Sequence, residues 1–204
     1  MKKGKYIVFE GGEGCGKSTQ SKLLYENLIS KGYDCIHIRE PGSTKEAQKL
    51  RCRLLNSKRE LSVNGERILF ARARHSLFEQ VIIPALNEDK IVLSDRSFYS
   101  TLAYQGYGSE YPIKSMENLI DVATFGIKPD LAIMIDIDPK IGLKKEINPD
   151  RFAQKLFEYH QRVNQGFLQL ARDNKECILI PYVEGKVELM QESIQYYLKQ
   201  RLNL

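Results

Sequence analysis

Residues 6–18, YIVFEGGEGCGKS, decide the fold, because a short apolar run leads directly into a glycine-rich octapeptide. Residues 11–18 (GGEGCGKS) match the pattern G-x-x-x-x-G-K-[ST]. The apolar run at residues 6–10 is typical of a buried strand, and residues 17–30 have the pattern of a helix. The order strand, glycine-rich turn, helix is the context in which this pattern cradles phosphate.

Each residue type in this motif is suited to phosphate binding for a physical reason. Glycines let backbone N–H groups converge on a phosphate, and a helix beginning near Lys17 adds the positive end of its dipole. Lys17 is expected to reach the β- and γ-phosphate oxygens of a nucleotide, and the Ser18 hydroxyl to ligate Mg²⁺. A turn that binds nothing is the alternative, but such a turn does not need the Lys-Ser pair. The predicted nucleotide-binding residues are Gly11, Gly12, Glu13, Gly14, Cys15, Gly16, Lys17, Ser18 and Thr19.

Further apolar runs alternate with helical patterns along the rest of the chain. The runs are residues 35–38, 91–94, 131–136 and 177–180, and the helical patterns are residues 17–30, 63–86, 113–125, 151–173 and 186–202. Pro84 is expected to end or kink the second helix. This alternation predicts an α/β fold of the P-loop NTPase type, with a doubly wound, five-stranded parallel sheet flanked by helices. No repeat or Pro/Ser-rich linker divides the sequence, so we expect one domain over residues 1–204.

The composition is that of a globular chain with a local excess of positive charge. The 204 residues are 42% hydrophobic and 28% charged, which excludes a disordered protein. The net charge is +5, and residues 39–74 carry ten Lys and Arg against four Asp and Glu. This excess suits anionic ligands but is too small for a dedicated nucleic-acid binder, so no nucleic-acid partner is expected.

The cysteines and the apolar runs bear on the cellular compartment. The four cysteines form no C-x-x-C pair, so we expect reduced thiols rather than a zinc site or a disulfide framework. The first apolar run is only four residues long, and no run of about 18 apolar residues follows. These features predict a cytoplasmic protein with no membrane partner.

Asp95 and Arg96 follow the apolar run at residues 91–94 and so belong at a carboxyl end of the sheet, where doubly wound folds bind ligands. Asp95 could complete the Mg²⁺ shell, and the planar guanidinium of Arg96 could clamp a phosphate. A surface ion pair without function is the alternative. A GTPase is disfavoured, because the string nearest to its N-K-x-D motif, NKEC at residues 174–177, ends in cysteine.

Phe70 and Arg74 are four residues apart in a predicted helix and therefore share one face. This spacing suits a ring that stacks on a planar base and a guanidinium that reads the edge of that base. The same helix has an apolar side, so packing in the core is the alternative for Phe70.

Several strings in their order resemble the bacterial thymidylate kinase family, which transfers the γ-phosphoryl group of ATP to dTMP. They are FEGGEGCGKSTQ (9–20), REPGST (39–44), LFARARH (69–75), DRSFYSTLAYQG (95–106), KPDLAIMIDID (128–138) and DRF (150–152). The likeness covers nearly the whole chain. It implies a homodimer that makes dTDP from dTMP with ATP and Mg²⁺.

The resemblance also implies roles for individual residues. Arg39 and Arg96 would hold the dTMP phosphate, and Glu13 would lie near the sugar and the phosphates. Phe70 would stack on thymine, Arg74 would read its edge, and Ser100 and Gln105 would contact the base. Arg151 would belong to a lid at about residues 142–152 and act with Lys17 and Arg96 in catalysis. Lys144 and Lys145 would assist in this lid or form a solvated charge pair.

The sequence departs from the family pattern at Ser43, where glycine is usual, and at Ser97, where an aromatic residue or histidine is usual. The lid is also short, with six residues, 144–149, between Leu143 and Asp150. Two other classes of function stay open. One is a deoxynucleoside kinase or a kinase for another nucleoside monophosphate, and the other is a nucleotide-binding regulatory or nucleic-acid-binding protein.

Overall fold

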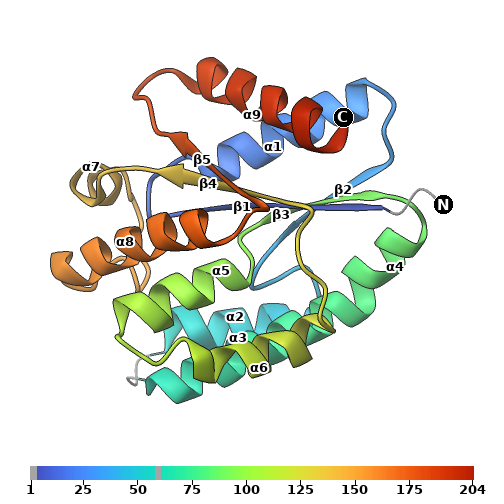
Figure 1. Cartoon of the computed structure of the whole chain (residues 1–204). Helices are drawn as coiled ribbons and strands as arrows, with labels where there is room; N and C mark the ends of the chain where they lie inside the picture. Colours follow the sequence, from blue (N-terminus) through green and yellow to red (C-terminus); the bar gives the residue numbers. More distant parts are fainter. Residues whose placement is uncertain (1–3, 58–60) are drawn as a thin grey trace.

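The computed structural model describes residues 4–57 and 61–204, and its centre is a five-stranded parallel sheet (Figure 1). The strand order is β2-β3-β1-β4-β5. The strands are β1 (Lys5–Gly11), β2 (Cys35–Arg39), β3 (Ile91–Asp95), β4 (Leu131–Asp136) and β5 (Cys177–Pro181). All five predicted strands and the predicted fold class are confirmed.

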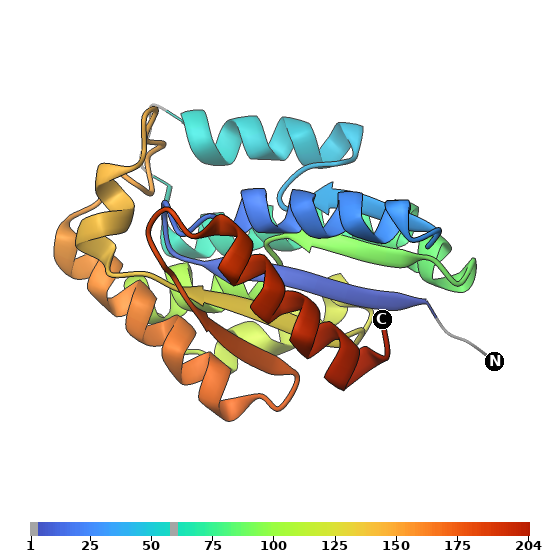
Figure 2. The same ribbon diagram turned by 90° about the horizontal axis from the view of Figure 1, so that it is seen from above.

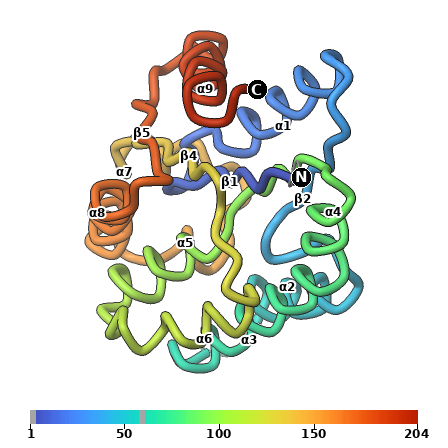
Figure 3. The backbone as a smooth tube through the Cα atoms, turned by 45° about the vertical axis from the view of Figure 1, so that its right-hand side comes forward, coloured from blue at the N-terminus to red at the C-terminus, as the bar shows by residue number. Residues whose placement is uncertain are grey.

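Helices cover both faces of this sheet (Figures 1 and 3). One face carries α1 (Lys17–Ser30) and α9 (Val187–Leu202). The other carries α2 (Lys45–Asn56), α3 (Val63–Leu77), α4 (Ile83–Asn87), α5 (Phe98–Thr101), α6 (Lys114–Thr124) and α8 (Phe157–Asp173). The short helix α7 (Pro139–Lys144) lies at one end of the sheet.

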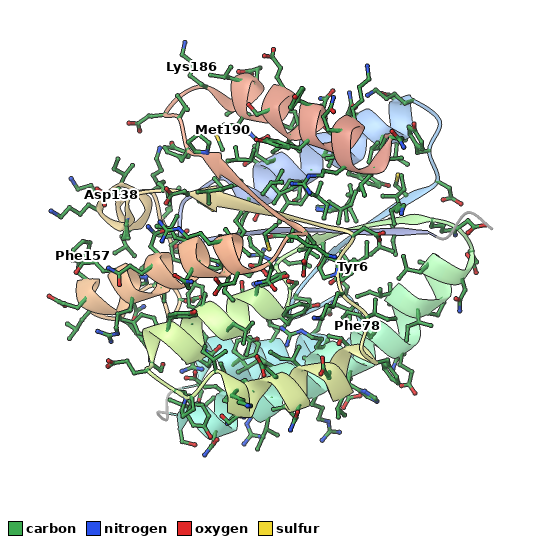
Figure 4. All side chains as sticks on the ribbon, in the orientation of Figure 1. Tyr6, Phe78, Asp138, Phe157, Lys186 and Met190 are labelled. Carbon is green, nitrogen blue, oxygen red and sulfur yellow. The ribbon has the colours of Figure 1, made fainter. Side chains whose placement is uncertain are left out.

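Alternation along β1 divides the apolar core into two layers. Tyr6 and Val8 face the side of α3 and α8, where the rings of Tyr6 and Phe78 meet edge to face with centroids 5.7 Å apart. Ile7 and Phe9 face α1 and α9. Figure 4 shows Tyr6 and Phe78 on one side of the sheet and Met190 of α9 on the other. The sheet is thus buried on both faces, as a parallel sheet requires.

The predicted helix at residues 63–86 is interrupted. After α3, residues Phe78–Ile82 form a π-helical segment, η1, before α4 begins. Pro84 has no N–H to donate to the carbonyl of Gln80, and the N–H of Ile83 instead bonds to the carbonyl of Phe78, five residues back. Pro84 therefore accompanies a change of helical register rather than the end of the helix.

The helix expected from residue 151 begins only at Phe157. Asp150 Oδ1 accepts hydrogen bonds from the N–H groups of Phe152 (2.8 Å) and Ala153 (3.1 Å), which makes a separate turn. Leu156 is extended, with φ −59° and ψ 152°, and this non-helical residue separates that turn from α8.

Three helical segments were not predicted. They are α2, α7, and α5 together with the π-helical segment η2 (Leu102–Gly108). Threonine is a favoured residue directly before a helix, and Thr44 stands directly before α2. In the structure its hydroxyl accepts a hydrogen bond from the N–H of Ala47 (3.0 Å). Among the described residues, no helix combines the length and the apolar character that crossing a lipid bilayer demands.

The topology brings the functional segments to one end of the sheet. Phe9 of β1 aligns with Asp95 of β3, and the N–H of Arg96 donates to the carbonyl of Phe9 (2.9 Å). Seen from above, the chain from α7 to the start of α8 lies at the same end as the loop that follows β1 (Figure 2). The glycine-rich loop, Asp95, Arg96 and the predicted lid therefore meet at the carboxyl ends of the strands.

Candidate functional site

A pocket of about 320 Å³ opens at this end of the sheet. Its walls come from the loop after β1, the ends of β2 and β3, the helices α2 and α3, the α5–η2 segment, and residues 146–153. Nine of the residues predicted from the sequence line it: Glu13, Lys17, Ser18, Arg39, Phe70, Arg74, Arg96, Ser100 and Gln105. The predicted residues Gly11, Gly12, Gly14, Cys15, Gly16, Thr19 and Asp95 lie outside this lining.

The glycine-rich loop has the backbone that anion binding requires. Gly14 (φ +64°) and Gly16 (φ +85°) are in the left-handed region, and a Cβ on Gly14 would come within 2.2 Å of the carbonyl oxygen of Gly142. The N–H of Gly14 donates to Glu146 Oε1 at 3.2 Å. The loop thus already holds a carboxylate oxygen, whose charge and acceptor chemistry match those of a phosphate oxygen.

Lys17 begins α1 and is 6% exposed. Its Nζ donates to the carbonyl oxygen of Gly12 at 3.0 Å, so the ammonium curls over the loop that it follows. This contact keeps the charge of Lys17 directed at the space that the loop encloses.

Ser18 and Asp95 offer oxygen atoms that fit a divalent cation. The Ser18 hydroxyl donates to Asp95 Oδ2 at 2.6 Å, and Arg39 Nε lies 3.5 Å from the same oxygen. Asp95 Oδ1 is buried and has no hydrogen-bond partner among the described residues. A buried carboxylate oxygen without a partner, next to a hydroxyl oxygen, is the kind of donor set that Mg²⁺ prefers.

Arg96 is held between Glu13 and Tyr104. Its Nη2 lies 3.3 Å from Glu13 Oε2, and its guanidinium carbon lies 5.2 Å from the ring centroid of Tyr104. The Tyr104 hydroxyl also donates to Glu13 Oε1 at 2.6 Å. Burial opposes the charge of Glu13, but the charges of Arg96 and Lys17 outweigh it and lower the pKa of Glu13 to about 2. Glu13 is therefore ionised at neutral pH.

Part of the local basic excess lies in this pocket. Arg39, Arg51 and Arg74 of residues 39–74 line it, together with Arg96. Burial lowers the pKa of Arg51, and the charges of Arg39 and Arg96 add to that effect, so the three guanidinium groups repel one another. Such a cluster favours an anion with several negative oxygens. The sequence analysis missed Arg51, counting it only within the basic excess, because α2 was not predicted.

Phe70 and Arg74 share one face of α3, as predicted. Phe70 is half-buried, lines the pocket, and packs against Phe152 with ring centroids 6.0 Å apart. Arg74 is 3% exposed, and its Nε lies 2.7 Å from Glu40 Oε2 while its Nη2 donates to Thr101 Oγ1 at 3.0 Å. Stacking on a base and packing in the core are thus compatible roles for Phe70. Glu40, which fixes Arg74, was not predicted as a site residue.

Arg151 does not lie in the pocket lining. Its Nη1 lies 2.6 Å from Glu66 Oε1, and its Nε donates to the carbonyl oxygen of Leu54. Glu66, which is 1% exposed, also accepts a hydrogen bond from Gln105 Nε2 at 2.9 Å. In this structure Arg151 therefore connects the lid to α2 and α3, instead of pointing at the phosphates as the resemblance implied.

The two lysines of the lid do not line the pocket either. Lys145 Nζ lies 3.0 Å from Glu184 Oε1 and 5.3 Å from the ring centroid of Tyr182, and Lys144 is exposed. The lid instead contributes Glu146, Asn148, Asp150, Phe152 and Ala153 to the lining.

Comparison with known proteins gives one consistent result. A family model described as thymidylate kinase matches residues 9–194. Thymidylate kinase from Thermoanaerobacter sp. (strain X514) is 39% identical over 191 residues, covering 93% of each chain. That from Dehalococcoides mccartyi (strain ATCC BAA-2100) is 47% identical over 165 residues, covering 79% of each chain. The crystal structure of thymidylate kinase from Ehrlichia chaffeensis superposes with a TM-score of 0.81 at 30% identity, covering 97% of this chain and 99% of that chain.

Proposed function

The chain belongs to the thymidylate kinase family, and we propose that the pocket at the carboxyl ends of its strands is where the γ-phosphoryl group of ATP passes to dTMP, giving dTDP and ADP. The observation that carries this proposal is the meeting of two phosphate-binding elements in one cavity. Glu13, Lys17 and Ser18 of the glycine-rich motif line this cavity, and so does the arginine cluster of Arg39, Arg51 and Arg96.

The donor side consists of the loop amides, Lys17, Ser18 and Asp95. The loop N–H groups and Lys17 bind the β- and γ-phosphates of ATP, and Lys17 meets the charge that builds on the oxygens of the transferring group. Ser18 and Asp95 hold Mg²⁺, which when bound neutralises phosphate charge and orients the oxygens. The buried, unpartnered Oδ1 of Asp95 supports this assignment.

The acceptor side consists of the arginine cluster and the walls around Phe70. Arg39, Arg51 and Arg96 hold the dTMP phosphate, so that one of its oxygens faces the γ-phosphorus. Phe70 stacks on thymine, and Arg74 and Gln105 border the base. A new bond forms between that acceptor oxygen and the γ-phosphorus as the bond to the β-bridging oxygen breaks, and the electron pair leaves with ADP. No covalent intermediate with the protein is needed, so positioning and charge carry the catalysis.

A coupled assay across acceptors tests the proposal. Phosphoryl transfer from ATP should be fastest with dTMP and much slower with dUMP, dCMP, dGMP and thymidine. Preference for thymidine would favour a deoxynucleoside kinase, and preference for another monophosphate would favour a different nucleoside monophosphate kinase. An absence of transfer together with a salt-dependent affinity for DNA would favour the nucleic-acid-binding alternative.

Replacing Phe70 with alanine should raise KM for dTMP, because stacking of a base on an aromatic ring contributes about 1–3 kcal/mol. That energy corresponds to roughly a 5- to 150-fold rise. Steady-state kinetics and thermal unfolding of Phe70→Ala check this together. If the variant melts earlier while its folded fraction binds dTMP normally, Phe70 is a core residue and not a platform for the base.

We further propose that two copies pair through α3 and α6. Ile68 on α3 is 60% exposed, and Val122 and Phe125, at the end of α6, are 68% and 48% exposed. These two helices pack side by side (Figures 1 and 3), so the three apolar side chains belong to one helical layer. A layer with exposed apolar side chains is suited to a symmetric partner.

Sedimentation of the whole chain tests the pairing. The expected species has twice the 23.5 kDa of the chain, and Val122→Lys should shift it to the monomer. Leu189→Lys, on α9 at the opposite face, replaces an equally apolar exposed residue and should leave the dimer intact. A chain that sediments as a monomer would overturn the proposal.

We also propose that residues 1–204 act as one catalytic domain in the cytoplasm, with no nucleic-acid or membrane partner. The single sheet that unites all five strands and the size of the curated relatives support the first part.

A further inference from the structure

Glu10 is a fully buried carboxylate in β1, directly before the glycine-rich loop. Its Oε1 accepts hydrogen bonds from the N–H and the hydroxyl of Ser97, at 2.7 and 2.8 Å, and from the N–H of Ser100 at 3.1 Å. Its Oε2 accepts from the Ser100 hydroxyl at 2.6 Å. The carboxylate of Glu10 thus accepts hydrogen bonds from both Ser97, which precedes α5, and Ser100, which lies within it.

A carboxylate at this depth is costly to keep. Burial raises the pKa of Glu10, and the hydrogen bonds from Ser100 and Ser97 together with the charge of Arg96 oppose that effect. An apolar side chain would avoid this cost but would leave the N–H groups of Ser97 and Ser100 without this acceptor. Glu10 therefore fixes the start of α5 and does more than fill space in β1.

The Ser100 hydroxyl connects Glu10 to Arg96. Ser100 Oγ has a single hydrogen, which it donates to Glu10, and it therefore presents a lone pair to Arg96 Nη1 at 3.0 Å. The other terminal nitrogen of the guanidinium, Nη2, donates to Glu13 Oε2 at 3.3 Å. Both ends of the Arg96 fork are fixed, one of them through Glu10.

Glu10 also holds the backbone on which Arg96 stands. Arg96 has φ +74°, a left-handed conformation that is rare for a residue with a Cβ and persists only where neighbours enforce it. Its own N–H is bonded to Phe9, and the next N–H, of Ser97, is bonded to Glu10. Consecutive residues of β1 therefore clamp the turn on both sides of Arg96.

We propose that Glu10, acting through Ser97 and Ser100, is a positioning residue that aims the guanidinium of Arg96 at the phosphate of dTMP. This inference rests on the proposed function, in which Arg96 binds that phosphate. It gives the Ser100 hydroxyl a use different from the base contact that the family resemblance implied. Glu10 touches neither nucleotide and acts only by fixing Arg96.

Two substitutions test whether Glu10 positions Arg96 through Ser100. Ser100→Ala removes the lone pair offered to Arg96 with little risk to the fold, and Glu10→Gln places an amide N–H₂ among groups that all donate. Both should lower kcat/KM for dTMP by about 10- to 100-fold, the order expected when a catalytic group is misplaced. KM for ATP should stay near the wild-type value, because the donor loop is untouched. Ser76→Ala is the matched control, since this buried serine bonds to Thr44 and Gln80 and does not line the pocket.

The decisive measurement repeats both substitutions in an Arg96→Ala background. There Ser100→Ala and Glu10→Gln should have no further effect on kcat/KM for dTMP, whereas a purely structural role would give the same loss in both backgrounds. Wild-type dTMP kinetics in a folded Ser100→Ala variant, or additive losses, would overturn the inference alone. Unchanged dTMP kinetics in Arg96→Ala itself would overturn the assignment of Arg96, and the inference with it.

Discussion

Replacing Lys17 with alanine should lower kcat by about 10²- to 10³-fold, as expected for the loss of one preorganised group that stabilises developing charge. Lys17 is the first residue of α1, where alanine is readily accommodated, so the helix should persist. The ammonium is already held over the loop by the carbonyl oxygen of Gly12, and the charge therefore needs no reorganisation when the γ-phosphoryl group moves. The effect should appear mainly in kcat, since the transferring oxygens gain charge in the transition state.

Circular dichroism and the coupled assay with dTMP measure the fold and the rate of this variant. Lys22→Ala is the matched control, because Lys22 is on the same helix and its 3.8 Å ion pair with Glu26 is exposed. Lys22→Ala should have wild-type kcat. A folded Lys17→Ala variant that keeps its kcat would remove the glycine-rich loop from the reaction and contradict the proposed function.

The sheet could be predicted because its strands are marked locally. A strand buried on both faces reads as a continuous apolar run, and each of the five runs stands beside a turn or a helical pattern. The glycine-rich loop then fixes the direction of the first strand and the place of the site. Residues that follow a strand directly, such as Asp95 and Arg96, can be assigned to that edge without knowing any packing.

Other parts of the fold depend on contacts that local patterns do not contain. The helix α2 buries only Ala47 and Leu54 among its twelve residues, and five of the twelve are charged, so the segment is more polar than the helices that were predicted. The π-helical segment η1 depends on the one missing N–H of Pro84. Neither feature changes the order of the strands, which explains why the fold class was still predictable.

The hydrogen bonds and ion pairs between side chains of the site were the least predictable part. Glu10 is separated from Ser100 by 90 positions, and Glu66 from Arg151 by 85. A carboxylate inside an apolar strand and another on a helix carry no local sign of their partners. The sequence could name Arg39 and Arg96 for the phosphate, although not Arg51, but only the packed structure identifies the carboxylates that hold the arginines of the site in place.

Replacing Arg151 with alanine should lower the free energy of unfolding by about 3–5 kcal/mol, the usual cost of removing one partner from a buried ion pair. The side chain of Glu66 is 2% exposed, and loss of Arg151 leaves its charge without the cation 2.6 Å away. Denaturant unfolding measures this change. Arg72→Ala is the matched control, because its pair with Glu46 has the same 2.6 Å distance but side chains 69% and 40% exposed, so its loss should cost less than about 1 kcal/mol.

A double variant, Arg151→Met with Glu66→Leu, leaves no uncompensated charge and should recover much of the lost stability, as apolar replacements of buried pairs often do.

The kinetics of Arg151→Ala separate this structural role from the transition-state role implied by the family resemblance. Because Glu66 also holds Gln105, which lines the pocket, Arg151→Ala should raise KM for dTMP more than it lowers kcat. If Arg151→Ala instead unfolds like the wild type and loses kcat alone, its guanidinium must leave Glu66 during the reaction and meet the transferring phosphoryl group.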